Sequence, residues 1–231
     1  MRKIGLIGGL SWYSTRTYYD YINRAIQHRN DRLASAPMLI ESLDFSRLVR
    51  LSTPEDWRYA SDILCQSARR LEDGGATAIL IGANSMHKVY DAVAASVSVP
   101  VLHIADCVAQ RMVEGGVKRA ALIGTRNVML DSFYRNRLVA RDIELVAPNM
   151  QRVETLDRII YGELLFGKAS RAAQRDLKTI ITNLAKEGAE AIVLGCTELE
   201  MIVDVDANVL PIYDCTAIHA EAAVDWIMGQ G

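Results

Sequence analysis

The chain is poor in cysteine and has no sustained excess of charge of either sign. Four cysteines in 231 residues do not form the dense framework that stabilises small secreted domains. The 26 basic and 28 acidic residues leave a net charge of −2. They are spread along the chain, which excludes a basic stripe for nucleic acid or a polybasic membrane patch. We therefore expect a protein of the reducing cytoplasm whose partner is a small molecule, with no nucleic acid and no membrane.

Long apolar runs and a nucleotide-binding glycine motif are also missing. No run approaches the roughly 20 apolar residues of a membrane-spanning helix, and the run from Ile4 to Leu10 is not followed by the cleavage site of a signal peptide. The glycines of Gly5-Leu6-Ile7-Gly8-Gly9 lack the G-x-G-x-x-G spacing, which argues against a dinucleotide site. Half of the residues are hydrophobic, so the chain can bury a large core as one domain or two small ones.

The most informative feature is an internal repeat. The stretch from Ala189 to Glu198 predicts a short buried strand, closed by a glycine, that leads into Cys-Thr-Glu. A similar stretch from Ala76 to Ser85 leads into Ala-Asn-Ser, and each half also has two basic residues before an apolar run that ends in glycine. Self-similarity over so long a period indicates two copies of one α/β unit. The strand ends of the two copies are expected to face each other across a cleft.

Short apolar strands alternate with amphipathic helices, which predicts a parallel sheet in each half. The expected strands are 4–8, 38–43, 78–81, 100–104, 120–123, 143–146, the strand before Cys196, and 209–213. The expected helices include 15–28, a helix from the Thr53-Pro54 start to Gly74, 131–138, 153–165, 169–186 and 217–228. The last helix is expected to pack back on the first half.

Cys196 is the leading candidate for a reactive group. It follows a glycine at a predicted strand end, where ligands bind in open α/β sheets. The start of a helix there would lower the pKa of the thiol and favour the thiolate. The alternative is a small buried core residue, because free cysteine is among the most buried residue types. Cys65, Cys107 and Cys215 are expected to serve packing.

Other polar residues follow the predicted strand ends. Asn84 and Ser85, which the repeat pairs with Thr197 and Glu198, could hold a carboxylate with side-chain donors and helix amides, or could merely cap a helix. His87 is close enough to act as an acid or base, although a lone histidine is more often structural. Arg47, beyond the second strand, could bind a second carboxylate or could be a solvated surface arginine.

Three motifs and the duplication give the chain a resemblance to a known family. It resembles the aspartate/glutamate racemase family, the cofactor-independent amino-acid racemases, in Gly8-Gly9-Leu10-Ser11-Trp12-Tyr13-Ser14-Thr15, Asn84-Ser85-Met86-His87-Lys88 and Gly195-Cys196-Thr197-Glu198. The resemblance implies two flavodoxin-like domains, 1–98 plus 208–231 and 99–207, with the site in the cleft between them, and a homodimer. It implies that no cofactor is needed, and we expect no metal. The residues expected to bind the substrate are Ser11, Arg47, Asn84, Ser85, Thr125, Thr197 and Glu198.

The same resemblance implies catalysis by two groups, at positions 83 and 196. Inverting a stereocentre removes a proton from one face of Cα and returns one to the other, which calls for two acid/base groups. Without a cofactor as electron sink, fixed donors must stabilise the carbanion. The chain has Ala83 where family members have cysteine or threonine. It also has Leu165 where aspartate-specific members have lysine.

Ala83 leaves four interpretations open. The chain could be an active-site variant, a racemase whose second base is His87 or a water, a one-sided enzyme such as a single-cysteine decarboxylase, or a binding protein that has lost catalysis. We favour a racemase of aspartate or glutamate with impaired or one-sided activity. The main alternative is a non-catalytic protein that binds a dicarboxylate or an amino acid.

Overall fold

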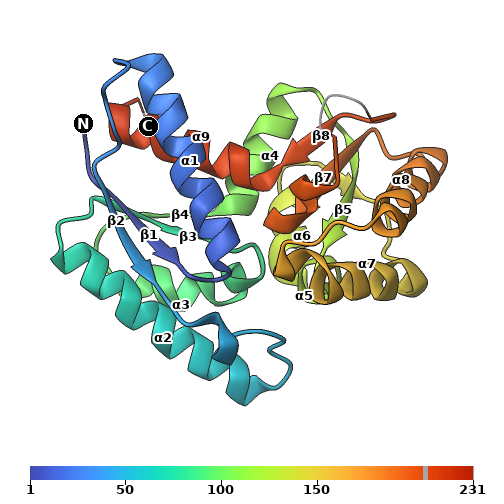
Figure 1. Ribbon diagram of the computed structural model, residues 1–231, viewed down its shortest axis with the longest axis horizontal. Coiled ribbons are helices and arrows are strands. Elements are labelled where there is room, and N and C mark those ends of the chain that lie inside the picture. The colour runs from blue at the N-terminus through green and yellow to red at the C-terminus, as the bar shows by residue number, and fades with distance from the viewer. Residues whose placement is uncertain (205–207, 231) are drawn as a thin grey trace. The chain divides into compact units, whose positions relative to one another are not determined.

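The computed structural model describes residues 1–204 and 208–230 and divides into two compact α/β units (Figure 1). The first unit comprises Met1–Ile104 and the C-terminal segment from His219, and the second comprises Ala105–Ile218. Each contains a four-stranded sheet in which every strand pair is parallel. Within the described residues, no helix has both the length and the apolar character needed to cross a membrane.

The sheet of the first unit has the strand order β2-β1-β3-β4. Its strands are β1 (Ile4–Gly8), β2 (Met38–Ser42), β3 (Ala78–Ile81) and β4 (Val101–Leu102). Its helices are α1 (Trp12–Arg29), α2 (Pro54–Asp73), α3 (Tyr90–Ala95) and most of α9 (Cys215–Met228), with the 3₁₀ turns η1 (Phe45–Arg47) and η2 (Ser85–Val89). This order is that of the first four strands of the flavodoxin-like arrangement.

The ends of α2 follow from its sequence. Thr53 accepts a hydrogen bond from the backbone of Asp56 while the Asp56 side chain accepts from the backbone of Thr53, which forms a capping box, and Pro54 occupies the first turn. Gly74 ends the helix, and Gly75 follows with a φ of 89° that favours glycine. The predicted start and end of this helix are confirmed.

Alternating side chains of β1 build two cores, one on each face of the first sheet. Ile4 and Leu6 belong to a cluster with α1 and with residues of α9, whereas Ile7 belongs to the cluster formed with α2. The α9 members of the first cluster are Ala220, Ala223, Val224 and Ile227. This packing confirms that the last helix returns to the first half.

The sheet of the second unit repeats the arrangement with the order β6-β5-β7-β8. Its strands are β5 (Arg119–Gly124), β6 (Glu144–Leu145), β7 (Ala191–Gly195) and β8 (Ile212–Asp214). Its helices are α4 (Ile104–Glu114), α5 (Arg126–Leu130), α6 (Ser132–Val139), α7 (Met150–Gly162) and α8 (Arg171–Lys186), with the 3₁₀ turns η3 (Leu164–Phe166) and η4 (Thr197–Met201). The identical strand order confirms the internal duplication.

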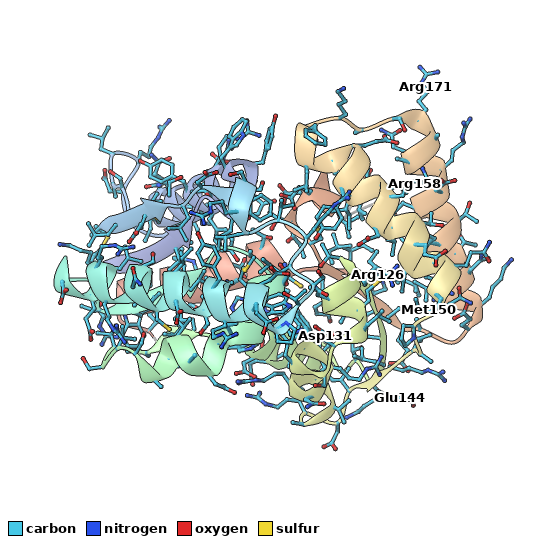
Figure 2. All side chains as sticks on the ribbon, turned by 90° about the horizontal axis from the view of Figure 1, so that it is seen from below. Arg126, Asp131, Glu144, Met150, Arg158 and Arg171 are labelled. Carbon is cyan, nitrogen blue, oxygen red and sulfur yellow. The ribbon has the colours of Figure 1, made fainter. Side chains whose placement is uncertain are left out.

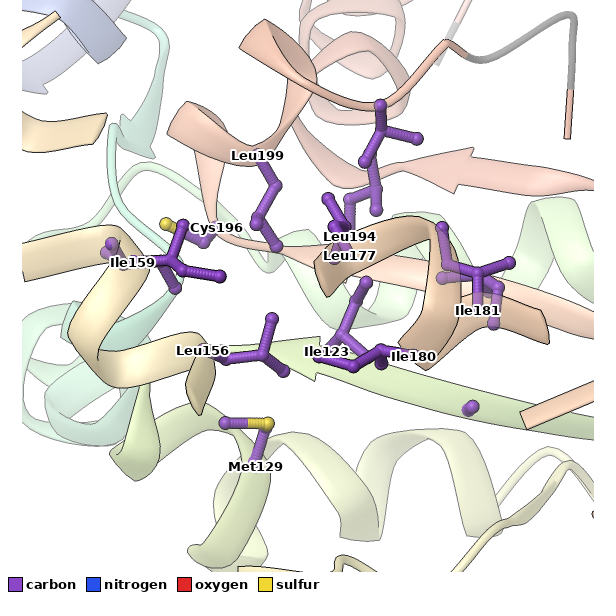
Figure 3. Close-up of a cluster of buried hydrophobic side chains, with 14 of the residues drawn as sticks. Ile123, Met129, Leu156, Ile159, Leu177, Ile180, Ile181, Leu194, Cys196 and Leu199 are labelled. Atoms are coloured by element: carbon purple, nitrogen blue, oxygen red, sulfur yellow. The ribbon is translucent and has the colours of Figure 1, made fainter. Parts of the chain in front are cut away.

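One core of the second unit lies between its sheet and the helices α7 and α8. It contains Ile123 of β5, Leu194 of β7, Leu156 of α7 and Leu177 of α8, and Cys196 belongs to the same cluster (Figure 3). On the surface, α7 and α8 are joined by an ion pair of 3.2 Å between Arg158 (Figure 2) and Asp176.

The unit boundaries differ from those expected. The sequence predicts that residues 99–104 belong to the second domain, but β4 pairs with β3 and completes the first sheet. The segment from 208 is expected in the first domain, but β8 pairs with β7 and completes the second sheet. The chain therefore returns to the first unit only at His219. Strand pairing thus makes β4 the fourth strand of the first sheet and β8 the fourth strand of the second. The expected end of the second domain, at residue 207, lies outside the described residues.

Candidate active site

Two polar side chains gather at the carboxyl edge of the first sheet. β1 and β3 are parallel neighbours, with Ile7 opposite Ile81, so the residues that follow them, Ser11 and Asn84, leave the sheet at the same edge. Gly82 permits the close approach of the two segments, because a Cβ there would lie 2.9 Å from the backbone oxygen of Ile7.

Ser11 and Asn84 have buried polar atoms that the fold does not satisfy. Their residues are only 5% and 4% exposed, yet the Ser11 hydroxyl and both amide atoms of Asn84 have no hydrogen-bond partner among the residues described. Neither side chain caps the helix that follows it, which argues against the capping alternative. Leaving such a group unsatisfied costs about 1–3 kcal/mol. These unsatisfied atoms make Ser11 and Asn84 candidates for binding a polar ligand.

Ala83 directly precedes Asn84 in the segment that follows β3. It is buried, and its methyl group cannot exchange a proton. The next polar residue, Ser85, is half-buried in the first turn of η2. The segment after β3 thus carries polar groups that can form hydrogen bonds with a ligand. At position 83, however, it has no group that can act as an acid or base.

The His87 ring serves the fold. It is 1% exposed, and its Nε2 accepts a hydrogen bond of 3.2 Å from the backbone N–H of Ile104. The neutral ring therefore carries its proton on Nδ1, which donates to the carbonyl oxygen of Ala83 across 2.9 Å. Because both ring nitrogens are engaged, this geometry speaks against His87 as the second base.

His87 belongs to a buried histidine cluster that sequence reasoning missed. Its ring centroid lies 4.7 Å from that of His103 and 5.7 Å from that of His219. His219 donates from Nε2 to the Leu102 carbonyl oxygen at 3.0 Å, and its Nδ1 accepts from the Tyr18 hydroxyl at 2.8 Å. Burial, with a smaller effect of His87, lowers the pKa of His219 to about 3. The residues are far apart in sequence, so only the fold reveals the cluster.

Arg47 is the last residue of η1 and lies at the surface. Its guanidinium carbon is 4.9 Å from the centroid of the Tyr59 ring, and its charge helps to lower the pKa of Asp44, whose main cause is the hydrogen bond from the Ser46 backbone. The ring contact holds the cation in place while leaving it exposed. Binding of a substrate carboxylate by Arg47 stays a prediction.

Cys196 occupies the corresponding edge of the second sheet. It directly follows β7, is 6% exposed, and its Sγ donates to Oε2 of Glu198 at 3.2 Å. On the neighbouring strand, Gly124 and Gly195 are opposite each other, so Thr125 and Cys196 leave the sheet side by side. The buried hydroxyl of Thr125 has no partner within the described part of the chain.

The expectation of a stabilised Cys196 thiolate is wrong. Burial, and then the carboxylate of Glu198, raise the pKa of the thiol well above its usual range. The backbone N–H groups of Glu198 and Leu199 act in the opposite direction, as a helix start should, but more weakly. The turn they belong to, η4, is only five residues long. Cys196 is therefore a protonated thiol at neutral pH.

The remaining cysteines are placed as packing residues. Cys65 packs against the core between β1 and α2. Cys215 is buried, with its Sγ 2.8 Å from the Tyr134 hydroxyl, and burial raises its pKa. Cys107 is half-buried on α4. In the described ranges, no cluster of three or more His, Cys, Asp or Glu side chains is arranged to hold a metal ion.

Fold and site together define a class of duplicated α/β proteins, which have polar and thiol side chains at the carboxyl ends of their parallel strands. The family model for the Asp/Glu/hydantoin racemases matches residues 7–223. The chain belongs to this family, and by that membership it is an isomerase of the amino-acid racemase type. The resemblance expected from the motifs is confirmed.

Individual relatives cover almost the entire chain. A candidate Asp/Glu racemase from Yersinia pestis is 38% identical with a TM-score of 0.91, covering 99% of this chain and 100% of its own. An aspartate racemase homologue from Pyrococcus horikoshii OT3 is 31% identical with a TM-score of 0.85 and the same coverage. The broad specificity amino-acid racemase RacX from Bacillus subtilis (strain 168) is 21% identical over 96% of both chains.

Proposed function

We propose that the chain acts on aspartate or glutamate by proton transfer at Cα, with Cys196 as an acid/base group and no dedicated group at position 83. The observation that carries the proposal is the position of the Cys196 thiol, which follows the end of β7 and is hydrogen-bonded to Glu198 at 3.2 Å. Family membership supports the reaction type. The repeat, which aligns Ala83 with Cys196, supports an activity that is impaired or one-sided.

Cys196 can move a proton in both directions. In the resting state the thiol is protonated, so it can donate a proton to one face of a carbanion. In the reverse direction the thiol first loses its proton to solvent, and the resulting thiolate removes the α-hydrogen. Only the substrate enantiomer whose α-hydrogen points at Cys196 is expected to exchange with solvent.

Ser11 and Asn84 are the proposed donors to the substrate α-carboxylate. A hydroxyl and an amide can each donate a hydrogen bond to a carboxylate oxygen, and both groups are buried without partners in the described structure. Binding a carboxylate would relieve that unsatisfied state and would stabilise the negative charge that develops on deprotonation. Ser85, Thr125 and Thr197 are proposed to contribute further hydroxyls, and Arg47 to bind the distal carboxylate.

The reaction is proposed to need no cofactor, and the protein is proposed to be a cytoplasmic homodimer. The lack of a cofactor and the homodimer follow from the family resemblance of the motifs, and the cytoplasmic location follows from the cysteine content and composition. The choice between aspartate and glutamate as substrate is part of the test, because a relative such as RacX is described as having broad specificity.

The test is Cα hydrogen exchange in heavy water. Each enantiomer of aspartate and glutamate is incubated with the protein and with the Cys196→Ser variant, and deuteration is followed by mass spectrometry. We expect one enantiomer to exchange much faster than the other, and the variant to lose that exchange. No exchange of any substrate by the unaltered protein would reject the proposal.

A binding or decarboxylating protein is the second candidate. Ala83 favours it, because loss of one acid/base group removes racemisation but leaves the unsatisfied binding groups of Ser11 and Asn84 intact. A decarboxylation needs only one proton donor, which a protonated Cys196 could supply. Calorimetric binding of aspartate without exchange would identify a binding protein, and release of carbon dioxide from a substituted malonate would identify a decarboxylase.

A further inference from the structure

A single hydroxyl closes the loop between β1 and α1. The Thr15 Oγ1 accepts a hydrogen bond of 2.7 Å from the backbone N–H of Gly9. The same hydroxyl donates to the carbonyl oxygen of Ser11 at 3.1 Å, and the Thr15 backbone N–H donates to that oxygen at 3.2 Å. Thr15 is therefore hydrogen-bonded to the residues before and after Leu10, Gly9 and Ser11, and fixes the path of the loop.

The loop that Thr15 holds is strained. Ser11 has a φ of 25°, and Gly9 has a φ of 72°, in a region that residues other than glycine rarely adopt. A Cβ at Gly9 would lie 2.1 Å from the carbonyl oxygen of Leu43. Strained residues persist only where their surroundings hold them, and they concentrate at functional sites. The strained residue here, Ser11, is also one of those with an unsatisfied buried hydroxyl.

The preceding residue holds the second loop of the site. Ser14 is buried, and its hydroxyl donates to the carbonyl oxygen of Gly82 at 2.8 Å. Gly82 begins the segment that continues through Ala83 to Asn84. Two consecutive hydroxyls in the first turn of α1 thus fix the two loops that carry Ser11 and Asn84.

We propose that Thr15 is a positioning residue for substrate binding, supported by Ser14. It does not touch the substrate. It keeps Ser11 in its strained conformation, so that the Ser11 hydroxyl and the Asn84 amide are oriented for a carboxylate before the ligand arrives, which lowers the entropic cost of binding. This inference rests on the proposed role of Ser11 and Asn84 as carboxylate donors.

A pair of substitutions separates the hydroxyl from the rest of the side chain. Thr15→Val removes both hydroxyl bonds but keeps the branched shape, which matters because Thr15 Cγ2 lies only 2.8 Å from where a Cβ on Gly8 would be. Thr15→Ser keeps the hydroxyl and loses the methyl group. Thr182→Val is the matched control, because the half-buried Thr182 hydroxyl also bonds a carbonyl oxygen four residues earlier, at 2.8 Å, but on α8.

The measurement is aspartate binding by calorimetry, with Cys196→Ser in every protein to prevent turnover. We expect Thr15→Val to raise the Kd about 10- to 100-fold, the size of a lost hydrogen bond plus loss of preorganisation. The Kd of Thr15→Ser and of Thr182→Val should stay within about 3-fold of that of the parent protein, because both hydrogen bonds of the hydroxyl at position 15 persist in these variants. Amide hydrogen exchange of Gly9 should accelerate in Thr15→Val alone, which a general loss of stability would not produce.

Ser11→Ala is the reference that separates this inference from the proposed function. If Ser11→Ala weakens aspartate binding while Thr15→Val binds normally, the positioning role is overturned and the carboxylate site stands. If Thr15→Val weakens binding and Thr15→Ser fails to restore it, packing rather than the hydroxyl is responsible and the inference is also overturned. A parent protein that binds no aspartate would overturn both.

Discussion

The thiol of Cys196 donates a hydrogen bond to the carboxylate of Glu198, two residues further along the chain, at 3.2 Å. Burial, and then the carboxylate of Glu198, raise the pKa of the thiol. A strand end that delivers a cysteine is therefore not enough to predict a thiolate, because the charge of the next acidic residue and the loss of water decide the protonation state.

Cys196 should react slowly with alkylating reagents at neutral pH. At pH 7, iodoacetamide should label the half-buried Cys65 and Cys107 before Cys196, because the thiolate is the nucleophile. Removing the nearby negative charge in Glu198→Gln should lower the pKa of Cys196 and shift its labelling curve to lower pH. Peptide mass spectrometry across a pH series measures both effects. Rapid labelling of Cys196 at pH 7, or no shift in Glu198→Gln, would contradict the assignment.

The buried His219 should make the protein less stable in acid. Its pKa is about 3 in the folded chain but about 6.5 in an unfolded one, so the unfolded state binds more protons between these values. The contribution to stability is complete above about pH 6.5 and is lost as the pH falls toward 3. The pH dependence amounts to as much as about 1.4 kcal/mol per pH unit.

Urea unfolding of His219→Gln between pH 7 and pH 4 tests this linkage. The variant should be less stable at pH 7, because the bonds to Tyr18 and Leu102 are altered, but its stability should fall less steeply with acid. If the stability of the variant and of the unaltered protein fell equally steeply with acid, His219 would not titrate as described.

Arg47 should contribute to binding only when the substrate has a second carboxylate. Losing a charge-assisted contact costs on the order of 1.5–3 kcal/mol. Arg47→Ala should therefore weaken the binding of aspartate about 10- to 100-fold and leave the binding of alanine nearly unchanged. Replacing the supporting ring in Tyr59→Leu should give a smaller effect of the same selectivity. Equal losses for both ligands would instead place Arg47 at the α-carboxylate.

The sequence was most informative where local chemistry and the repeat agreed. The Thr53-Pro54 start and the glycine pair at Gly74 define α2 in the sequence and in the structure. The two copies of the strand-glycine pattern predicted two parallel sheets, and both have the same strand order. Local patterns of this kind are readable because the residues that determine them are neighbours in the chain.

Features that depend on distant contacts were missed. The assignment of 99–104 failed because β4 is fixed by pairing with β3, which no local pattern records. The role of His87 depends on the backbone of Ile104, and the pKa of Cys196 depends on burial in a core built from β5, α7 and α8. Ser14 and Thr15 stand inside a recognised motif, but their bonding partners become apparent only in three dimensions.

The most direct test of the central claim is to supply the missing group. Inversion at Cα needs a second acid/base group, and the repeat aligns Ala83 with Cys196. Racemisation of aspartate and glutamate is followed by circular dichroism from each enantiomer, in the unaltered protein and in Ala83→Cys. We expect the substitution to raise racemisation about 10²- to 10⁴-fold, the typical value of one acid/base group, and Ala83→Ser to give much less. Fast and equal rates in both directions for the unaltered protein, with no gain in Ala83→Cys, would contradict the account.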